Sequence, residues 1–304
     1  MVDLSIQIGD LKLRTPVLVA SGTFGYGQEA AELVDLNKLG GIITKSISLH
    51  PRPGNPPNRI AEVPAGMLNS IGLANVGVDA FIAEKLPFLR KLDTAVIVNV
   101  AGSSAEDFLH VIQRLEDEDG IDAYELNFSC PNVKEGGLEF SQNTRVTEKV
   151  TTMIRKCTSR TMITKLTPNV TRVGEIASAA ESGGADAVSL INTLVGMAID
   201  IHTRRPKIAT VTGGYSGPAI KPVALAKVFE VSKKVDIPII GIGGIMSGAD
   251  AVEFFLAGAS AIEIGTANFI DPRVSENVTE DIRQYCLKHH FDSVREFVGS
   301  LLNP

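Results

Sequence analysis

Eight short apolar runs recur along this chain of 304 residues, and amphipathic segments separate them. Each run is rich in valine and isoleucine and is short enough to be one strand buried on both faces. The runs are TPVLVASG (15–22), GGIITKS (40–46), AVIVNVAG (95–102), AYELNFSC (123–130), TMITKLTP (161–168), AVSLINT (187–193), PIIGIGG (238–244) and AIEIGTA (261–267). Eight such strands alternating with helices favour an α/β fold of the (β/α)₈ or TIM-barrel type over an open doubly wound sheet.

The segments between the runs have the periodicity of helices packed on a sheet. In EDFLHVIQRLEDE (106–118) and TEKVTTMIRKC (147–157), apolar residues fall three and four positions apart. Near the start, LSIQIGDLKL (4–13) predicts a β-hairpin that turns at Gly9-Asp10 and caps the bottom of the barrel. No linker divides the chain, so residues 1–304 are expected to form a single domain.

Two connections are much longer than the others. They run from Ile47 to about Val78 and from Leu194 to Pro222, and we expect both to be structureless loops. Long loops in a compact domain are usually functional. Because the loops that follow the strands of a barrel form its active-site face, we expect these two at the C-terminal face.

The overall composition excludes several classes of protein. With a net charge of −6 and no basic block, the chain is not expected to bind nucleic acid. Its apolar runs are too short to span a membrane, and MVDLSIQIGDLKL lacks the features of a signal peptide. The three cysteines are far apart with no Cys-x-x-Cys pair, which argues against a disulfide framework or an iron–sulfur cluster in this chain. A reducing cytoplasm is the expected location.

Polar or small residues end every one of the eight runs. They are Ala20-Ser21-Gly22, Lys45-Ser46, Asn99, Asn127, Lys165, Asn192-Thr193, Gly243-Gly244 and Gly265-Thr266. Because these strand ends meet at the catalytic face of a barrel, they predict a functional site. The glycines of the last two runs let backbone N–H groups approach an anion closely, which predicts a phosphorylated ligand.

The lysines and asparagines indicate which other chemical groups this ligand carries. Lys45 and Lys165 end apolar runs, where a free charge is costly unless it is paired with an anion, and a Schiff-base lysine is the competing interpretation. Asn69, Asn99, Asn127 and Asn192 each offer a donor and an acceptor, which suits a flat heterocycle with carbonyl and N–H edges.

Cys130, in NFSCPNVK (127–134), follows a strand end on a loop over the expected site. None of the five histidines gives it a recognisable zinc spacing or an obvious Cys–His partner, so no metal site is expected. Cys130 is therefore expected to be either a thiolate base or a nucleophile, and the spacing of residues does not distinguish these two roles. Cys157 and Cys286 lie in helical patterns and are expected to be packing residues.

Several motifs together resemble the dihydroorotate dehydrogenases, in order and over essentially the whole chain. They are TKSIS, RPGNPPNR, GMLNSIGLANVG, NFSCPNVK, GGYSGPAIKPVAL, GIGGI and IGTA. The combination of NFSCPN with NSIGL is highly specific, and GGYSGPAIKPVAL with IDIHTRRP is similar to the catalytic subunits of class 1B rather than class 1A. The resemblance implies a barrel that holds one FMN and oxidises dihydroorotate to orotate in pyrimidine (UMP) biosynthesis.

The resemblance also implies a role for each matching residue. Cys130 would be the base that removes the C5 proton, while hydride passes from C6 to flavin N5. The FMN phosphate would contact Gly217, Gly243, Gly244, Gly265 and Thr266. The ring and ribityl chain of FMN would contact Ser21, Lys45, Ser46, Asn99, Asn127, Lys165 and Ile191. The substrate would contact Lys45, Asn69, Ser70, Ile71, Gly72, Leu73, Asn127, Asn192 and Thr193.

The same resemblance implies partners. Class 1B enzymes pass electrons to NAD⁺ through a second subunit that carries FAD and a [2Fe-2S] cluster, so a homodimer of this chain within a heterotetramer is expected.

Three alternative functions stay open. They are a class 1A-like homodimer that reduces fumarate, a barrel aldolase with a Schiff-base lysine, and a non-catalytic phosphate-binding barrel.

Overall fold

Eight parallel strands close into a barrel in a computed structural model that describes residues 2–128 and 140–302. Each strand lies within one of the eight predicted runs, which confirms the (β/α)₈ prediction. The strands are β3 (Val17–Val19), β4 (Gly41–Ile43), β7 (Ala95–Val100), β8 (Ala123–Asn127), β9 (Thr161–Lys165), β10 (Ala187–Leu190), β15 (Ile239–Ile242) and β16 (Ala261–Ile264). They follow one another around the barrel in chain order, and β16 closes on β3 with Ile262 opposite Val17.

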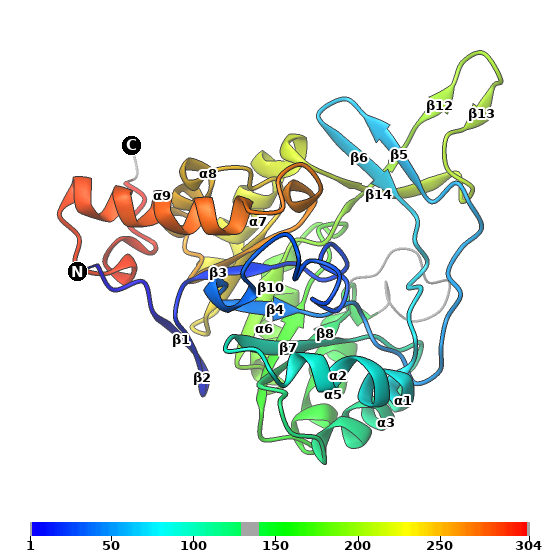
Figure 1. The fold of residues 1–304 in the computed structure, drawn as a ribbon, viewed down its shortest axis with the longest axis horizontal. Helices are drawn as coiled ribbons and strands as arrows, with labels where there is room; N and C mark the ends of the chain where they lie inside the picture. The colour runs from blue at the N-terminus through cyan, green and yellow to red at the C-terminus, as the bar shows by residue number, and fades with distance from the viewer. Residues whose placement is uncertain (1, 129–139, 303–304) are drawn as a thin grey trace.

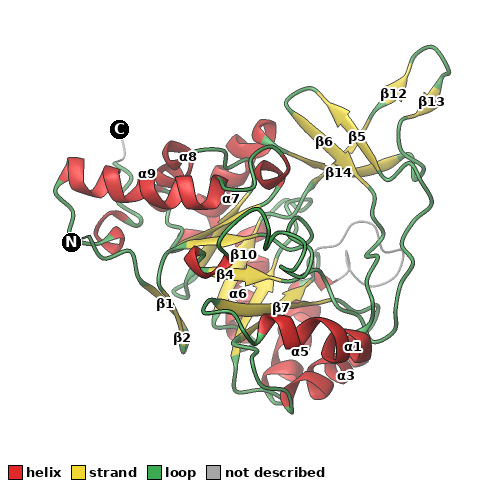
Figure 2. Cartoon of the chain, viewed as in Figure 1, coloured by secondary structure: helices red, strands yellow, loops and turns green. Residues whose placement is uncertain are grey.

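Helices cover the outside of the barrel (Figures 1 and 2). They are α1 (Val78–Ala80), the π-helical η2 (Phe81–Lys85), α2 (Leu86–Leu89), α3 (Ala105–Glu116), α5 (Thr144–Arg155), α6 (Val173–Ser182), α7 (Lys221–Ser232), α8 (Gly248–Leu256) and α9 (Val274–His289). Short 3₁₀ turns add η1 (Leu36–Lys38), η3 (Pro218–Ile220), η4 (Thr266–Phe269) and η5 (Val294–Phe297). In α3, Ser104 and Asp107 form a capping box, and Phe108 and Val111 are buried against the strands.

The first connection departs from the predicted alternation of strand and helix. Between β3 and β4, the chain forms turns and only the short η1. Gly22, Gly25 and Gly27 all adopt positive φ in this connection. These left-handed turns break the first part of the connection, and residues 28–33 continue it as turns rather than as a helix.

The N-terminal hairpin caps the barrel as predicted. Strands β1 (Ile6–Ile8) and β2 (Leu11–Leu13) pair antiparallel around Gly9-Asp10. The hydroxyl of Thr161, the first residue of β9, donates a hydrogen bond of 3.3 Å to the carbonyl oxygen of Ile8, so the hairpin lies at the N-terminal end of the strands. The two chain ends lie side by side, since Asp3 bridges to Ser293 (Figure 1).

The two long connections are not structureless, and that prediction is wrong. They pair with each other in a second, antiparallel sheet of order β11-β14-β6-β5, which we call the upper sheet. Its strands are β5 (Ile60–Val63), β6 (Gly66–Asn69), β11 (Leu194–Met197) and β14 (Thr212–Ser216). A small hairpin of β12 (Ile199–Asp200) and β13 (Arg205–Pro206) extends from it (Figure 1).

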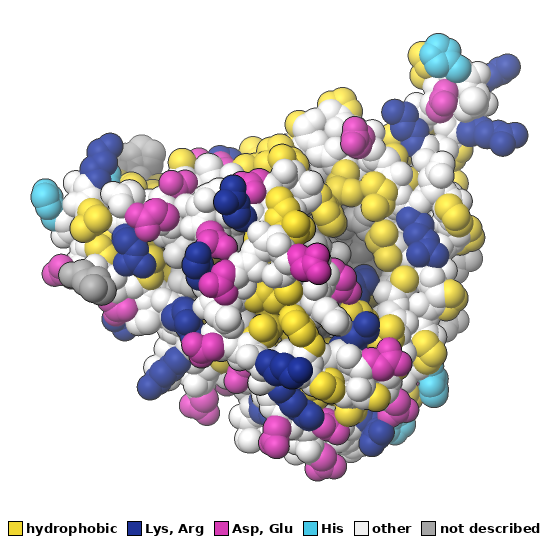
Figure 3. All heavy atoms as spheres, viewed as in Figure 1, with side chains coloured by type: hydrophobic (Ala, Val, Ile, Leu, Met, Phe, Trp, Pro, Cys, Tyr) yellow, Lys and Arg dark blue, Asp and Glu magenta, His cyan; other side chains and the backbone are white. Residues whose placement is uncertain are grey.

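The surface of these connections is unusually apolar. Exposed hydrophobic side chains include Val195, Met197, Ile199, Ile201 and Val211. Figure 3 shows the hairpin tip carrying hydrophobic, basic, acidic and histidine side chains together. Within residues 2–128 and 140–302, no helix has the length and apolar character needed to cross a membrane.

Candidate active site

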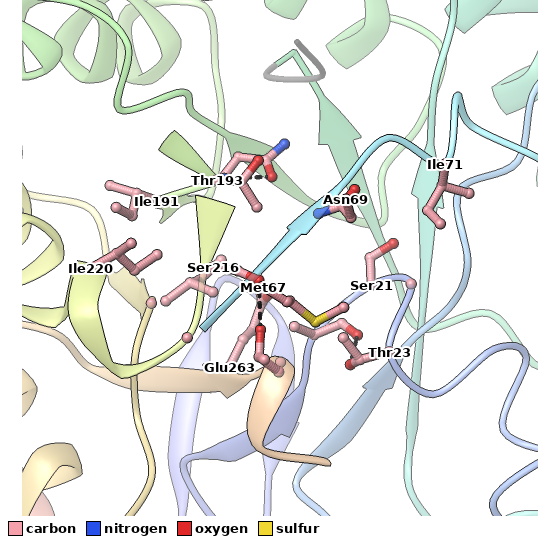
Figure 4. Close-up of a pocket in the computed structure, with 18 of the residues that line it drawn as sticks. Ser21, Thr23, Met67, Asn69, Ile71, Ile191, Thr193, Ser216, Ile220 and Glu263 are labelled. Carbon is pink, nitrogen blue, oxygen red and sulfur yellow. Dashed lines mark hydrogen bonds between the residues drawn. The ribbon is translucent and has the colours of Figure 1, made fainter. Parts of the chain in front are cut away.

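A cavity of about 320 Å³ opens at the C-terminal end of the barrel strands, under the upper sheet (Figure 4). Its lining comes both from the strand ends and from the upper sheet, so it joins segments that are far apart in the sequence. The predicted residues that line it are Ser21, Lys45, Ser46, Asn69, Ile71, Gly72, Leu73, Asn99, Asn127, Lys165, Ile191, Asn192, Thr193, Gly217, Gly243, Gly244, Gly265 and Thr266.

Ser70 is the one described residue of the predicted site that does not line the cavity. It is fully buried, and its hydroxyl has no hydrogen-bond partner among the described residues. Its backbone N–H donates to Arg59, and its carbonyl oxygen accepts from the Asn55 side chain. Asn69 and Ile71 face the cavity, and Ser70 between them points away because successive side chains of an extended segment alternate.

Glycines form one corner of the cavity. Gly217, Gly243 and Gly244 have φ values of 110°, 126° and 75°. A Cβ on Gly244 would lie 3.0 Å from the carbonyl oxygen of Gly217, and a Cβ on Gly217 would lie 2.6 Å from Gly66. Close packing against neighbouring residues therefore requires glycine at Gly217 and Gly244, and both line the cavity with no side chain between their backbone and the cavity. This geometry fits a phosphate group.

One side-chain hydrogen bond links this corner to the upper sheet. The hydroxyls of Ser216, at the end of β14, and Thr266, at the start of η4, lie 2.8 Å apart (Figure 4). Ser216 was not predicted as a site residue. Its strand is part of the upper sheet, and the sequence predicts a structureless connection there.

The two lysines occupy different environments. Lys45 is half-buried at the cavity mouth, and its Nζ would lie 3.7 Å from a Cβ built on Gly22. Lys165 is buried at the cavity floor. Its Nζ lies 3.3 Å from Glu125 Oε2 and 3.0 Å from Glu263 Oε2, and both glutamates are fully buried.

Two further residues complete this group, which we call the floor cluster: Asn99, Glu125, Lys165, Ser189 and Glu263. Asn99 Nδ2 donates to Glu125 Oε2 at 2.5 Å, and the Ser189 hydroxyl donates to Glu125 Oε1 at 2.7 Å. The five side chains come from β7, β8, β9, β10 and β16 and meet inside the barrel. Sequence reasoning missed both glutamates, although a charged residue in the middle of AYEL and AIEI was a usable signal.

The surroundings of the three titratable side chains in the floor cluster shift the pKa of each. Burial alone would lower the pKa of Lys165, but the attraction of Glu125 and Glu263 outweighs it and raises that pKa. Burial would raise the pKa of Glu125, but the charge of Lys165 and hydrogen bonds with Glu263, Ser189 and Asn99 hold it below its ordinary value. For Glu263, burial and repulsion by Glu125 raise the pKa well above the ordinary value. Lys165 is therefore an ammonium rather than the neutral amine that a Schiff base requires.

Two buried polar atoms of the floor cluster lack partners among the described residues. They are Asn99 Oδ1 and Glu263 Oε1, and both side chains line the cavity. Buried polar atoms are nearly always hydrogen-bonded, so these two fit a ligand that carries its own polar groups. Together with the phosphate corner, this matches the donors and acceptors of a flavin mononucleotide.

The asparagines are held toward the cavity by short-range contacts. Asn127 Nδ2 lies 3.4 Å from the Ser46 hydroxyl, and Asn69 Nδ2 lies 3.4 Å from the carbonyl oxygen of Gly214. The backbone N–H of Thr193 donates to Asn192 Oδ1 at 2.7 Å.

Cys130 lies outside the described residues, so its predicted role as base stays a prediction. Phe128 and Phe140, which flank that segment, have ring centroids 5.5 Å apart in a cluster with Phe108. Cys286 is buried in the core and Cys157 packs against a second apolar cluster, as predicted. No group of three or more His, Cys, Asp or Glu that could hold a metal occurs within the described ranges.

Comparisons with known proteins agree with this geometry. A family model described as dihydroorotate dehydrogenase matches residues 3–286. Two similar curated proteins are the dihydroorotate dehydrogenase B (NAD(+)) catalytic subunits of Phocaeicola vulgatus, 54% identical over 99% of each chain, and Geotalea daltonii, 53% identical over 98% of each. A crystal structure of DHODH from Eimeria tenella in complex with ferulenol has a TM-score of 0.84 at 22% identity, over 98% of this chain and 88% of that one.

Proposed function

This chain belongs to the dihydroorotate dehydrogenase family, and we propose that it is the FMN-binding catalytic subunit of an enzyme that reduces NAD⁺. It is an oxidoreductase that oxidises dihydroorotate in pyrimidine biosynthesis, with a flavin and a separate partner subunit. The observation that best supports FMN is one cavity that combines a glycine-lined corner with a buried ammonium and unpartnered polar atoms.

The cavity residues would hold FMN in the following way. Backbone groups of Gly243, Gly244, Gly265 and Thr266, with Gly217 beside them, would receive the phosphate. Residues of the barrel strand ends would contact the ring and ribityl chain: Ser21, Lys45, Ser46, Asn99, Asn127, Lys165 and Ile191. Bound FMN supplies a ring that accepts hydride. The Lys165 ammonium would stabilise negative charge on that ring.

The substrate would bind at the cavity mouth. The half-buried Lys45 can pair with the carboxylate of dihydroorotate, because an ammonium and a carboxylate form a charge-assisted hydrogen bond. Asn69, Asn127 and Asn192 line the same cavity and can bind the carbonyl and N–H edges of the pyrimidine. Residues 71–73 and Thr193 would complete the substrate site with backbone and side-chain contacts.

Cys130 would remove the C5 proton of the substrate. A proton next to a carbonyl group needs a base whose pKa is not far below the working pH, and a thiol of ordinary pKa about 8.5 meets this with modest tuning. Cys130 follows Asn127, which lines the cavity, by three positions. We expect Cys130→Ser to bind FMN normally and to reduce it much more slowly at neutral pH.

The electrons would leave through a partner subunit that carries FAD and a 2Fe–2S cluster. The relatives named as NAD(+)-linked catalytic subunits support this assignment. A homodimer of this chain within a heterotetramer, and a cytoplasmic location, belong to the same proposal. The aldolase alternative loses support at Lys165, one of the two lysines that could form its Schiff base, because Lys165 is held as an ammonium.

The electron acceptor tests this proposal against the fumarate-reducing alternative. We expect the purified chain to form orotate with NAD⁺ as acceptor only when the electron-transfer subunit is added. Orotate formation with fumarate, by the chain alone, would favour the class 1A-like homodimer instead. The Cys130→Ser variant serves as the control for activity from a contaminating enzyme.

A further inference from the structure

The two glutamates of the floor cluster touch the same ammonium but have unequal surroundings. Glu125 accepts hydrogen bonds from Lys165, Asn99 and Ser189, which together contact both of its carboxylate oxygens. Glu263 accepts a hydrogen bond from Lys165 and shares another with Glu125, and its Oε1 has no partner among the described residues. An ionised carboxylate needs several donors when it is buried, and only Glu125 has them.

The charges around Glu263 also indicate that Glu125, and not Glu263, is the ionised carboxylate. The charged side chains that face it are Glu125 from β8 and Lys165 from β9, while β7 and β10 contribute the neutral Asn99 and Ser189. Leu18 is its register neighbour on β3, and Lys45 of the β4 end lies at the cavity mouth. Two ionised carboxylates against one ammonium would leave an uncompensated negative charge in the barrel, which is strongly unfavourable.

We propose that Glu263 is a neutral, protonated acid that positions Lys165, while Glu125 alone balances the charge of that ammonium. As a carbonyl acceptor, Glu263 holds the ammonium at the cavity floor without adding a second negative charge beneath the cofactor ring. The floor cluster is then neutral as a whole. This inference rests on the proposed function, because the ring that it serves is that of FMN.

The first test needs no flavin and measures the free energy of unfolding of the full chain against pH. A buried acid whose pKa is raised on folding holds a proton that the unfolded chain releases, so stability is full below its unfolded pKa and is lost as pH rises. We expect the native chain to lose stability relative to Glu263→Gln as pH rises above about 4.3, the ordinary value for Glu. Parallel profiles for the two proteins would overturn the proposal.

The chain offers a matched control for this comparison. Lys221 Nζ also contacts two carboxylates, Asp250 at 2.6 Å and Glu253 at 2.8 Å, but the Glu253 side chain is 48% exposed. Because water solvates that pair, we expect Glu253→Gln to leave the pH profile of the native chain unchanged. A change as large as that of Glu263→Gln would mean that the effect does not depend on burial, which also contradicts the proposal.

The second test counts charges through the reduction potential of bound FMN at neutral pH. If Glu263 is neutral, Glu263→Gln leaves the potential unchanged, and only the Glu125→Gln/Glu263→Gln double variant raises it. If Glu263 is ionised, Glu263→Gln alone raises the potential as the first of two steps, and this would overturn the proposal. Should the double variant fail to fold, the single variant still decides between the two outcomes.

The two tests separate this inference from the proposed function. A chain that takes up no FMN would contradict the proposed function, and the positioning role would fall with it even if the pH profiles differ. A chain that binds FMN but shows parallel pH profiles would leave the proposed function intact and would overturn the role of Glu263 alone.

Discussion

The floor cluster and the upper sheet bound the same cavity but are built on different physical grounds. The floor cluster consists of buried side chains from five of the eight barrel strands, held by ion pairs and hydrogen bonds of 2.5 to 3.3 Å. The upper sheet is mostly half-buried, is rich in glycine and joins two connections that are more than a hundred residues apart in the sequence.

This difference indicates where electrostatics and where shape determines the structure of the site. In the floor cluster, low dielectric makes each charge depend on its partners, so single substitutions should act through electrostatics. In the upper sheet, close backbone approach decides the structure, so single substitutions should act through shape. Four variants, two of them paired with a matched control variant, test this contrast.

Removing the ammonium should have the largest effect. Lys165→Met leaves two buried carboxyl groups without their cation, and we expect a loss of about 3–5 kcal/mol in unfolding free energy at neutral pH. Denaturant unfolding measures it. Lys221→Met, at a more exposed site where a lysine also contacts two carboxylates, should cost about 1 kcal/mol. Equal losses for the two variants would show that burial of the floor cluster does not strengthen its ion pairs.

Glu125→Gln should have the next largest effect, with a clear dependence on pH. The pKa of Glu125 is held below its ordinary value by Lys165 and by its hydrogen-bond donors, against the opposing effect of burial. Its ionised form therefore contributes stability that is present above about pH 4.3 and is lost as pH falls toward the folded pKa. We expect a cost of about 2–3 kcal/mol at neutral pH that shrinks in acid. A cost that grows in acid would contradict this assignment.

In the upper sheet, the effect should be steric. A Cβ on Gly214 would lie 2.1 Å from the Thr193 hydroxyl, and Thr193 lines the cavity. We expect Gly214→Ala to cost about 1–3 kcal/mol and to weaken orotate binding, measured by calorimetry. Gly196→Ala is the matched control, since its Cβ would meet the Leu68 and Tyr215 side chains at 3.0 and 3.2 Å and no residue of the cavity lining. Similar binding by both variants would argue against a role of the upper sheet in the site.

The smallest effect should come from the one side-chain bond between the phosphate corner and the upper sheet. Ser216→Ala removes the hydrogen bond to Thr266, which has a length of 2.8 Å, and should cost about 1 kcal/mol. A double-mutant cycle with Thr266→Val isolates that contribution. A coupling energy near zero would mean that the two hydroxyls do not hold these parts of the molecule together.

The sequence predicted the floor better than the upper sheet, and the reason is physical. Buried barrel strands are continuous apolar runs, so all eight could be located, and their polar ends marked most of the cavity. Glu125 and Glu263 were missed because an apolar run hides a single charge unless the inward direction of its side chain is considered. Ser70 was predicted to contact substrate, but the alternation of side chains turns it away.

The upper sheet could not be predicted from local pattern. Gly66, Gly196, Gly213 and Gly214 lie within its strands, and glycine is depleted in strands generally. Pairing of β14 with both β6 and β11 joins two connections that are far apart in the sequence, and no local pattern indicates such pairing. The sequence TGGYS therefore indicated a loop where the fold makes a central strand.

The most direct test of the central claim is to mix the FMN-loaded chain with dihydroorotate in the absence of oxygen and to follow the flavin absorbance. We predict that the yellow colour bleaches in the chain alone, because the cavity is proposed to hold both the ring and the substrate. A yellow protein that does not bleach, under conditions in which it binds orotate, would contradict this account of the site.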